Sequence, residues 1–192
     1  MGLKITKDHM AARLDGDPED LEDKDKLTLM KKEYKLAIQT HPDYVAAKQE
    51  ITKYLINLPK SISHNTADLS KINRLYAEAQ SYSSRITTLE VAALENTLRW
   101  QRLLNLIDAY IEDRKSELLV SENIIDMSIP KAEAKIRNIL KKEHRTRTKF
   151  KDELTQAQGF QRMVEIKKKD MGQVITTLGK QVKALSLENS LR

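Results

Sequence analysis

Apolar residues recur at alternating spacings of three and four along two stretches of the chain, residues 66–127 and 130–190. This heptad repeat brings one side chain of each turn onto the same face of an α-helix and is typical of coiled coils and helical bundles. At 1.5 Å per residue, about sixty residues make a helix of roughly 90 Å, so the pattern predicts two very long helices. The clearest seam positions are Leu89, Ala93, Trp100, Leu104, Ile107, Ile111, Leu154, Val164, Ile175, Leu178 and Val182.

The junction between the two stretches is short and carries residues typical of a helix boundary. Ser128 is a good N-cap, and Pro130 fits the first turn of the helix that follows. A turn this short between long helices favours an antiparallel hairpin within the chain. The alternative is an extended, kinked rod whose helices pair only between subunits.

Three glycines, Gly159, Gly172 and Gly179, lie inside the second stretch. Each costs up to about 1 kcal/mol relative to Ala in an exposed helix. We therefore expect either kinks at these positions or close packing of another helix against them.

Residues 26–58 predict two short helices that form a small N-terminal hairpin. Pro42 and Asp43 mark the boundary between them, because Pro fits a first helical turn and Asp favours the positive end of the helix dipole. Pro59 ends this segment, and Asn65 is a candidate N-cap for the first long helix.

Residues 1–25 predict a partly irregular acidic arm, because Gly16 and Pro18 interrupt them. The expected fold class is therefore all-α. It is an elongated helical, coiled-coil protein with two long antiparallel helices and a short N-terminal helical hairpin. We also expect a homo-oligomer, because the apolar stripe between Leu89 and Ile125 is wider than one partner helix needs.

Charge is divided unevenly along these elements. The chain of 192 residues has 34 Lys and Arg against 28 Asp and Glu, a net charge of +6. Residues 131–192 hold 16 basic and 7 acidic residues, whereas residues 15–25 hold seven acidic residues and one Lys. The two blocks can bind each other, within or between subunits, or each can meet a separate partner.

The basic block is the strongest candidate for a binding site. Its density of positive charge suits phosphate groups, acidic protein surfaces or anionic lipid. We do not expect a membrane partner, because the segment has few bulky apolar residues opposite its charges. Nucleic acid and an acidic protein surface remain as alternatives. The candidate residues are Lys131, Lys135, Arg137, Lys141, Lys142, Arg145, Arg147, Lys149 and Lys151, with a second cluster at Lys167, Lys168 and Lys169.

Trp100 lies between Arg99 and Arg102, and this grouping has the chemistry to stack a nucleotide base. The same residue falls on the heptad seam, which favours packing in the core. Neither Tyr76 nor Tyr110 gives a stronger signal for stacking.

No motif predicts catalysis, a cofactor or a metal. The chain lacks cysteine, a phosphate-binding glycine loop and histidines at ligand spacing. The acidic run near Asp15 differs from a calcium loop, since Asp20 stands where Gly is needed and Lys26 where the bidentate Glu is needed. We expect a protein that is not an enzyme and that has no cofactor and no metal site.

The expected function is an accessory or assembly factor that oligomerises and binds nucleic acid through a basic helix. The alternative is a structural or scaffolding coiled-coil protein of a virion or other large assembly, which binds acidic protein surfaces. In composition alone, the lysine-rich, cysteine-free helical build is similar to that of several classes of phage protein. The lack of cysteine, of a signal segment and of a long apolar stretch predicts an intracellular, cytoplasmic protein, or one incorporated into a virion.

Overall fold

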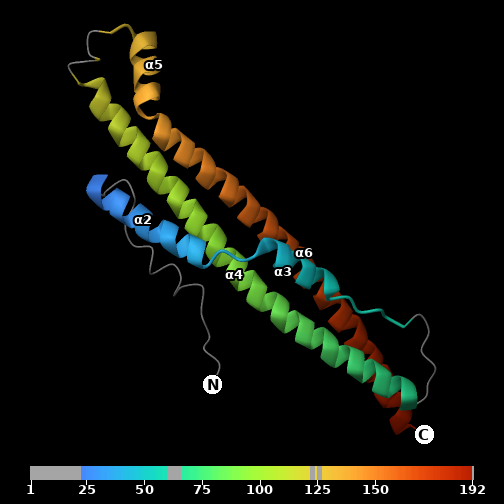
Figure 1. The fold of residues 1–192 in the computed structure, drawn as a ribbon. Helices are drawn as coiled ribbons and strands as arrows, with labels where there is room; N and C mark the ends of the chain where they lie inside the picture. Colours follow the sequence, from blue (N-terminus) through green and yellow to red (C-terminus); the bar gives the residue numbers. More distant parts are fainter. Residues whose placement is uncertain (1–22, 60–65, 122–123, 125–126, 192) are drawn as a thin grey trace. The chain divides into compact units, whose positions relative to one another are not determined.

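The computed structural model describes residues 23–59, 66–121, 124 and 127–191, and the regular secondary structure in these ranges is all helical. This confirms the all-α class, with α4 and α6 as the two long helices. The chain divides into two compact units. The first combines α2 with Arg99–Glu153, and the second combines Thr40–Leu98 with the chain from Leu154 onward. The helices in chain order are α2 (Asp23–Gln39), α3 (Tyr44–Lys53), α4 (Thr66–Leu119), α5 (Ile129–Ile139) and α6 (Lys141–Ser190) (Figure 1).

In the second unit, the core follows the heptads of both long helices. The deepest positions of each helix lie seven residues apart, so they form a single stripe on one face. On α4 this stripe alternates large and small residues, and α3 packs against both helices. The core residues are Ile72, Ala79, Ile86 and Ala93 of α4, Val164, Met171, Leu178 and Leu185 of α6, Ala47 and Ile51 of α3, and Tyr54, the residue that follows α3.

The two long helices run antiparallel in this unit. Lys168 of α6 binds Glu90 of α4 at 2.5 Å. Further along α6, the position of Gly179 lies beside Tyr76, which comes earlier on α4. The helices therefore pair within the chain, as the predicted hairpin requires, and the alternative of a rod that pairs only between subunits is wrong.

In the first unit, α2 packs on α4 and α6 through an aromatic cluster. The ring centroid of Tyr34 lies 6.1 Å from that of Trp100 and 5.8 Å from that of Phe150. Trp100 and Phe150 are 5.9 Å apart and come from α4 and α6. Trp100 is only 1% exposed, so its place in the core, predicted from the seam, is confirmed.

Charged side chains also hold α2 to α4. Lys26, although 1% exposed, forms an ion pair with Asp113. Glu33 is 7% exposed and accepts hydrogen bonds from Arg99 at 3.3 Å and from Arg102 at 3.1 Å. A buried charge is tolerated only when it is paired, so these contacts fix how α2 lies on α4.

The first long helix ends earlier than predicted, at Leu119 and not at Met127. The hydroxyl of Ser121 donates to the carbonyl of Leu118 at 2.7 Å, and the backbone N–H of Ile124 bonds to the carbonyl of Ser121 at 3.0 Å. These turn-type bonds replace the helical ladder, and Ile124 is buried at 3% exposure. The heptad pattern does not predict the burial of Ile124, because this burial depends on tertiary contacts.

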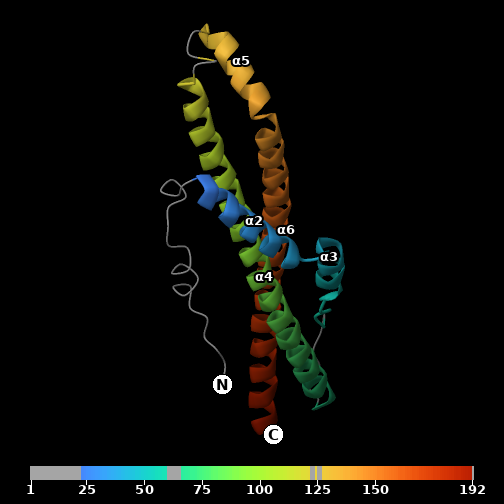
Figure 2. The same cartoon turned by 60° about the vertical axis from the view of Figure 1, so that its left-hand side comes forward.

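The second long helix is interrupted, whereas the sequence predicts one unbroken helix. Leu140 separates α5 from α6, with φ −86° and ψ 16°. Helix α5 and the start of α6, up to Glu153, belong to the first unit, and they meet at an angle (Figure 2). Ala132, Ile136 and Leu140 are buried at spacings of four residues. The break lets this apolar face of α5 turn inward, although neither Pro nor Gly marks it.

The predicted helix boundaries hold in part. Ser128 occupies the N-cap position of α5 and Pro130 lies in its first turn, as predicted, but the side chain of Ser128 makes no capping hydrogen bond. The helix after Pro42 begins at Tyr44 and ends at Lys53, so it is shorter than predicted. Asp43 caps it by accepting hydrogen bonds from two backbone N–H groups at 3.0 Å each.

Two predicted segments fall largely outside the described residues. These are the acidic arm, of which only residues 23–25 are described, as the start of α2, and the linker with Asn65. The two short N-terminal helices are present as α2 and α3, and they belong to different units.

Helix α6 continues without a break through all three of its glycines. A Cβ at Gly159 or Gly172 would meet nothing within 4 Å, and one at Gly179 would lie 3.6 Å from the ring of Tyr76. Only Gly179 therefore lies beside another helix.

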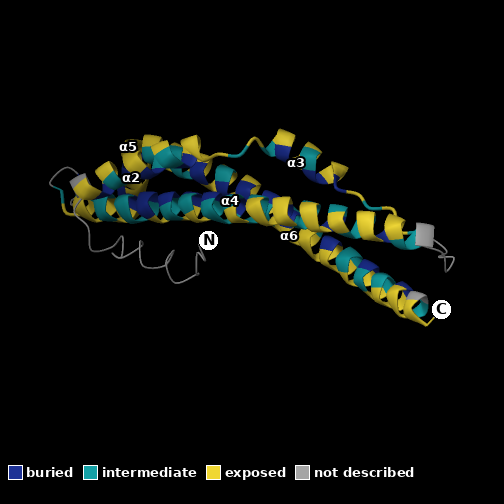
Figure 3. Ribbon diagram, turned by 90° about the horizontal axis from the view of Figure 1, so that it is seen from below, coloured by how far each residue is buried: buried dark blue, intermediate teal, exposed yellow. Residues whose placement is uncertain are grey.

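Most of the predicted seam is buried. Ala93, Trp100, Ile107, Ile111, Leu154, Val164 and Leu178 are buried, and Leu89, Leu104, Ile175 and Val182 are half-buried. Figure 3 shows buried positions recurring along α4 between exposed ones. The core also includes Leu103, Leu106 and Phe160, which the seam prediction missed.

Candidate nucleic-acid interface

The start of α6 presents a stripe of cations on one face. Lys141, Arg145 and Lys149 follow one another at intervals of four residues, and Lys142 lies beside them. Residues three and four apart share a face of an α-helix, so these four side chains are neighbours. All four are exposed. We call Lys141, Lys142, Arg145 and Lys149 the basic stripe.

In the part of the chain that the structure describes, the basic stripe is not neutralised by ion pairs. Within the described residues, no ion pair involves any of its four members. Lys149 instead donates a hydrogen bond of 3.0 Å to the hydroxyl oxygen of Tyr34. Its Nζ is 5.5 Å from the ring centroid, so it approaches the hydroxyl end of the ring and does not lie over the face. This hydrogen bond, with a smaller contribution from the charge of Glu153, raises the pKa of Lys149 above its ordinary value, so the side chain stays charged at neutral pH.

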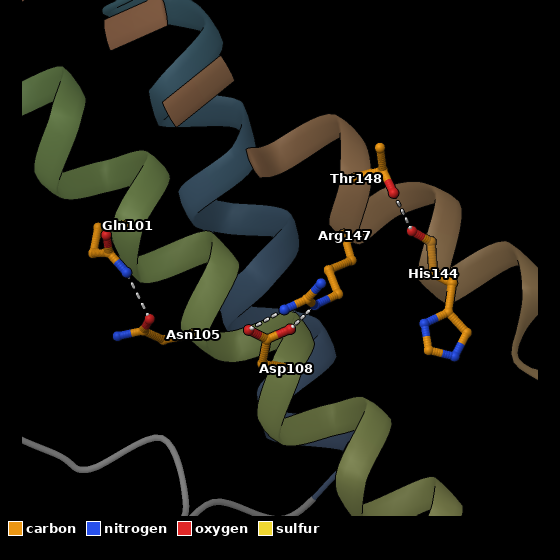
Figure 4. A network of polar contacts seen from close by, with 6 residues as sticks. All are labelled: Gln101, Asn105, Asp108, His144, Arg147 and Thr148. Atoms are coloured by element: carbon orange, nitrogen blue, oxygen red, sulfur yellow. Dashed lines mark hydrogen bonds and ion pairs between the residues drawn. The ribbon is translucent and has the colours of Figure 1, made fainter. Parts of the chain in front are cut away.

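Arg147 belongs to the predicted site but points the other way. Its guanidinium forms an ion pair with Asp108 of α4, and the second contact, from Nη2 to Oδ2, is 3.4 Å (Figure 4). The hydrogen bond and the charge of Asp108 raise the pKa of Arg147. Arg147 therefore links α6 to α4, and its charge is already balanced.

Helix α2 adds cations that the sequence did not single out. Lys31, Lys32 and Lys35 are exposed, whereas Glu33 is turned inward onto Arg99 and Arg102. The outer surface of α2 between positions 31 and 35 is therefore basic. No local signal in the sequence shows this, because an acid between lysines normally remains in solvent.

A pocket of about 300 Å³ lies between α2 and α6 in the first unit. Its walls are apolar or aromatic at Leu27, Met30 and Phe150, and Tyr34 and Thr146 add hydroxyl groups. The charged residues in its lining are Lys31 and Lys149, both cations. We call this the α2–α6 pocket. Its lining includes Lys149 of the basic stripe and Lys31 of α2, so the pocket lies between these two groups of cations.

The remaining predicted cations are distributed over other surfaces. On α5, Lys131 and Arg137 are exposed and Lys135 is half-buried, and Lys151 is exposed on α6. The second predicted cluster lies in the second unit. There Lys168 is paired with Glu90, Lys167 is half-buried and Lys169 is exposed.

A second cavity, of about 460 Å³, lies beneath α5. Its lining is apolar at Ile111, Ile136 and Leu140, but its charged groups have both signs. They are Glu112, Lys115, Glu133 and Arg137. This cavity has no preference for anions comparable to that of the α2–α6 pocket.

Two further classes of site were assessed over the described ranges. No helix there combines the length and apolar character that crossing a bilayer demands. No group of three or more His, Asp or Glu side chains in the same ranges is arranged to hold a metal ion. No protein-family model, curated protein or solved structure matches this chain.

Proposed function

We propose that this protein binds nucleic acid through the basic stripe and the lysines of α2, as a non-enzymatic accessory or assembly factor. The observation that carries the proposal is the separation of charges in the first unit. Glu33 and Asp108 are engaged with arginines, whereas Lys141, Lys142, Arg145 and Lys31 remain exposed. Exposed Lys and Arg on neighbouring helices suit a phosphate backbone, because each can contact a phosphate without reading the base.

The test is a salt titration of binding to labelled DNA, in single-stranded and double-stranded form. The variant carries Lys141→Glu, Lys142→Glu and Arg145→Glu. A matched control carries Lys71→Glu, Lys180→Glu and Lys183→Glu, which are exposed lysines of the second unit and change the net charge equally.

The control should bind like the parent chain. The stripe variant should bind weakly at low salt. The slope of log K against log salt should also be smaller in magnitude, by about 2 for single strands, because three phosphate contacts are lost. Equal losses in both variants would show that only total charge matters. If the parent chain does not bind DNA at low salt, the alternative is favoured, a structural protein whose basic stripe binds acidic protein surfaces.

Homo-oligomerisation remains part of the proposal, but one reason for it has changed. The width of the apolar stripe on α4 is explained within the chain, because α2 packs on Trp100 and α3 packs in the core beside Leu89. The remaining support is the exposure of Val91 and Leu98, 45% and 41%, seven residues apart on α4. Sedimentation equilibrium should show a dimer or larger that Val91→Glu with Leu98→Glu dissociates, and a monomeric parent chain would refute it.

A further inference from the structure

The α2–α6 pocket differs from the rest of the basic surface because it combines aromatic and cationic groups. Tyr34 is half-buried and lines the pocket, and its ring centroid is 5.8 Å from that of Phe150, another lining residue. Lys31 and Lys149 are also among its lining residues, and no acid is. A ligand that fits must therefore have an apolar, planar part and a negative charge close to it.

We propose that this pocket receives one unpaired base of a single-stranded nucleic acid, while Lys31 and Lys149 contact the phosphates on either side. This inference rests on the proposed function, which supplies the phosphate contacts along the basic stripe. It adds a preference for single strands over duplex, since a base within a duplex is stacked and paired and cannot enter.

The size of the pocket fits a single base. About 300 Å³ is the lower end of the range for small-molecule sites, which admits one base with its sugar and leaves no room for a base pair. Stacking on an aromatic ring tolerates every base, because each base has a π-face. Binding should therefore depend little on sequence.

The polar groups of the pocket still have unused hydrogen-bond donors and acceptors for the ligand. An ammonium group has three N–H donors, and Lys149 uses one of them on Tyr34. The hydroxyl of Tyr34 accepts that bond and keeps its own proton to donate to a base carbonyl. Thr146 donates to the carbonyl of Lys142 at 3.1 Å, so its oxygen can still accept from an exocyclic amine.

The test uses the full chain with oligothymidylate and with a duplex of the same length. One oligothymidylate carries 5-iodouracil, which crosslinks on irradiation to an aromatic side chain stacked on it, and mass spectrometry locates the crosslink. The variants are Tyr34→Leu, which removes the ring, and Tyr34→Phe, which keeps the ring. Circular dichroism and a cooperative thermal transition check that each variant is folded.

We expect a crosslink at Tyr34 in the parent chain. Tyr34→Leu should weaken single-strand binding about 5- to 150-fold, with the salt dependence and duplex binding unchanged, while Tyr34→Phe stays close to the parent. The crosslink does not depend on any variant, so it decides the matter even if Tyr34→Leu unfolds.

Two results would overturn the inference alone. One is crosslinking only at other residues, and the other is equal affinity for single strand and duplex with a folded Tyr34→Leu variant that binds like the parent. In both cases nucleic acid still binds, so the proposed function stands. Absence of binding to either form by the parent chain would refute the proposed function and this inference together.

Discussion

Charged residues at the interface of α2 and α4 have unequal surroundings. The ammonium of Lys26 is enclosed, with its side chain 2% exposed, whereas the carboxylate of Asp113 is 45% exposed. Removing one partner of an ion pair is costly when the charge left behind is cut off from water. The two members of this pair should therefore respond differently to substitution.

Asp113→Ala should lower the free energy of unfolding by about 3 kcal/mol, because it leaves Lys26 buried without its counter-charge. Lys26→Met keeps the volume and leaves Asp113 in contact with water, so it should cost less than about 1.5 kcal/mol. Urea denaturation followed by circular dichroism measures both. Equal losses, or a larger loss for Lys26→Met, would contradict this account of the pair.

Two stacked tyrosines of the second unit predict how stability changes at alkaline pH. Burial and the hydrogen bond to Glu50 raise the pKa of Tyr54, and the hydrogen bond to Glu78 raises that of Tyr82, both above the ordinary value of 10.0. A pKa raised by folding means that the folded state holds the proton more tightly. The stabilisation is therefore complete below pH 10 and is lost as the pH rises through the folded-state values.

The melting temperature should fall as the pH increases above 10, and the fall should be shallower when Tyr54 and Tyr82 are both replaced by Phe. Melting curves at neutral pH and above pH 10 measure the difference between the parent and the double variant. Identical alkaline slopes would show that these hydroxyl groups titrate alike in the folded and unfolded chains.

At the scale of the element, α4 depends on alternating large and small residues. Ala79 lies between Ile72 and Ile86 along the buried stripe, Ala93 follows Ile86, and Ala79 is fully buried. Small residues at these positions let the facing helices approach closely, so added volume has no room.

Ala79→Leu should destabilise the protein by about 1–3 kcal/mol, since overpacking forces shifts in the neighbouring side chains. Ala77→Leu is the matched control, because it makes the same change at an exposed position of the same helix. It should change stability by less than about 0.5 kcal/mol. Thermal denaturation compares the two, and a tolerated Ala79→Leu would mean that the stripe is loosely packed.

Elements differ in how far the sequence determines them. The heptads of α4 and α6 are local patterns, so the sequence predicts both helices, their antiparallel pairing and the burial of Trp100. The end of α4 and the break at Leu140 depend on the tertiary contacts that bury Ile124 and Leu140. No local sequence pattern predicts these contacts.

The candidate site is less predictable than the fold, because it depends on which charges are paired. The sequence indicates the cations of the basic stripe, but it gives Arg147 the same weight as Arg145. Only tertiary structure places Asp108 next to Arg147 and turns Glu33 inward, which makes the outer surface of α2 basic. The pocket at Tyr34 is likewise formed by two helices more than 100 residues apart in the chain.

At the scale of the whole molecule, α4 and α6 each contribute residues to both units, which bears on the cooperativity of unfolding. Neither helix is interrupted where one unit passes into the other, at Leu98 and Leu154. Melting one unit would therefore leave frayed ends in the middle of two helices.

We expect the two units to unfold in a single transition. Trp100 is the only tryptophan and lies in the first unit, so its fluorescence reports that unit, whereas far-ultraviolet circular dichroism reports both. Coincident transitions by the two probes would meet a standard test of two-state unfolding. A fluorescence transition at lower denaturant concentration would instead mean that α2 and its neighbours open first.

The interleaving of the two units also affects how the chain folds as it is synthesised. Lys26 meets Asp113 87 positions later, and Tyr34 meets Lys149 115 positions later. While the ribosome is still producing α4, the partners of α2 are incomplete. The first unit cannot close until the start of α6, up to Glu153, has been translated, and the second unit needs the rest of α6. Helical bundles usually fold fast because their contacts are local, whereas contacts this distant make folding slow. We therefore expect this all-helical chain to fold more slowly than most helical bundles, and truncated chains that end within α4 to remain unfolded.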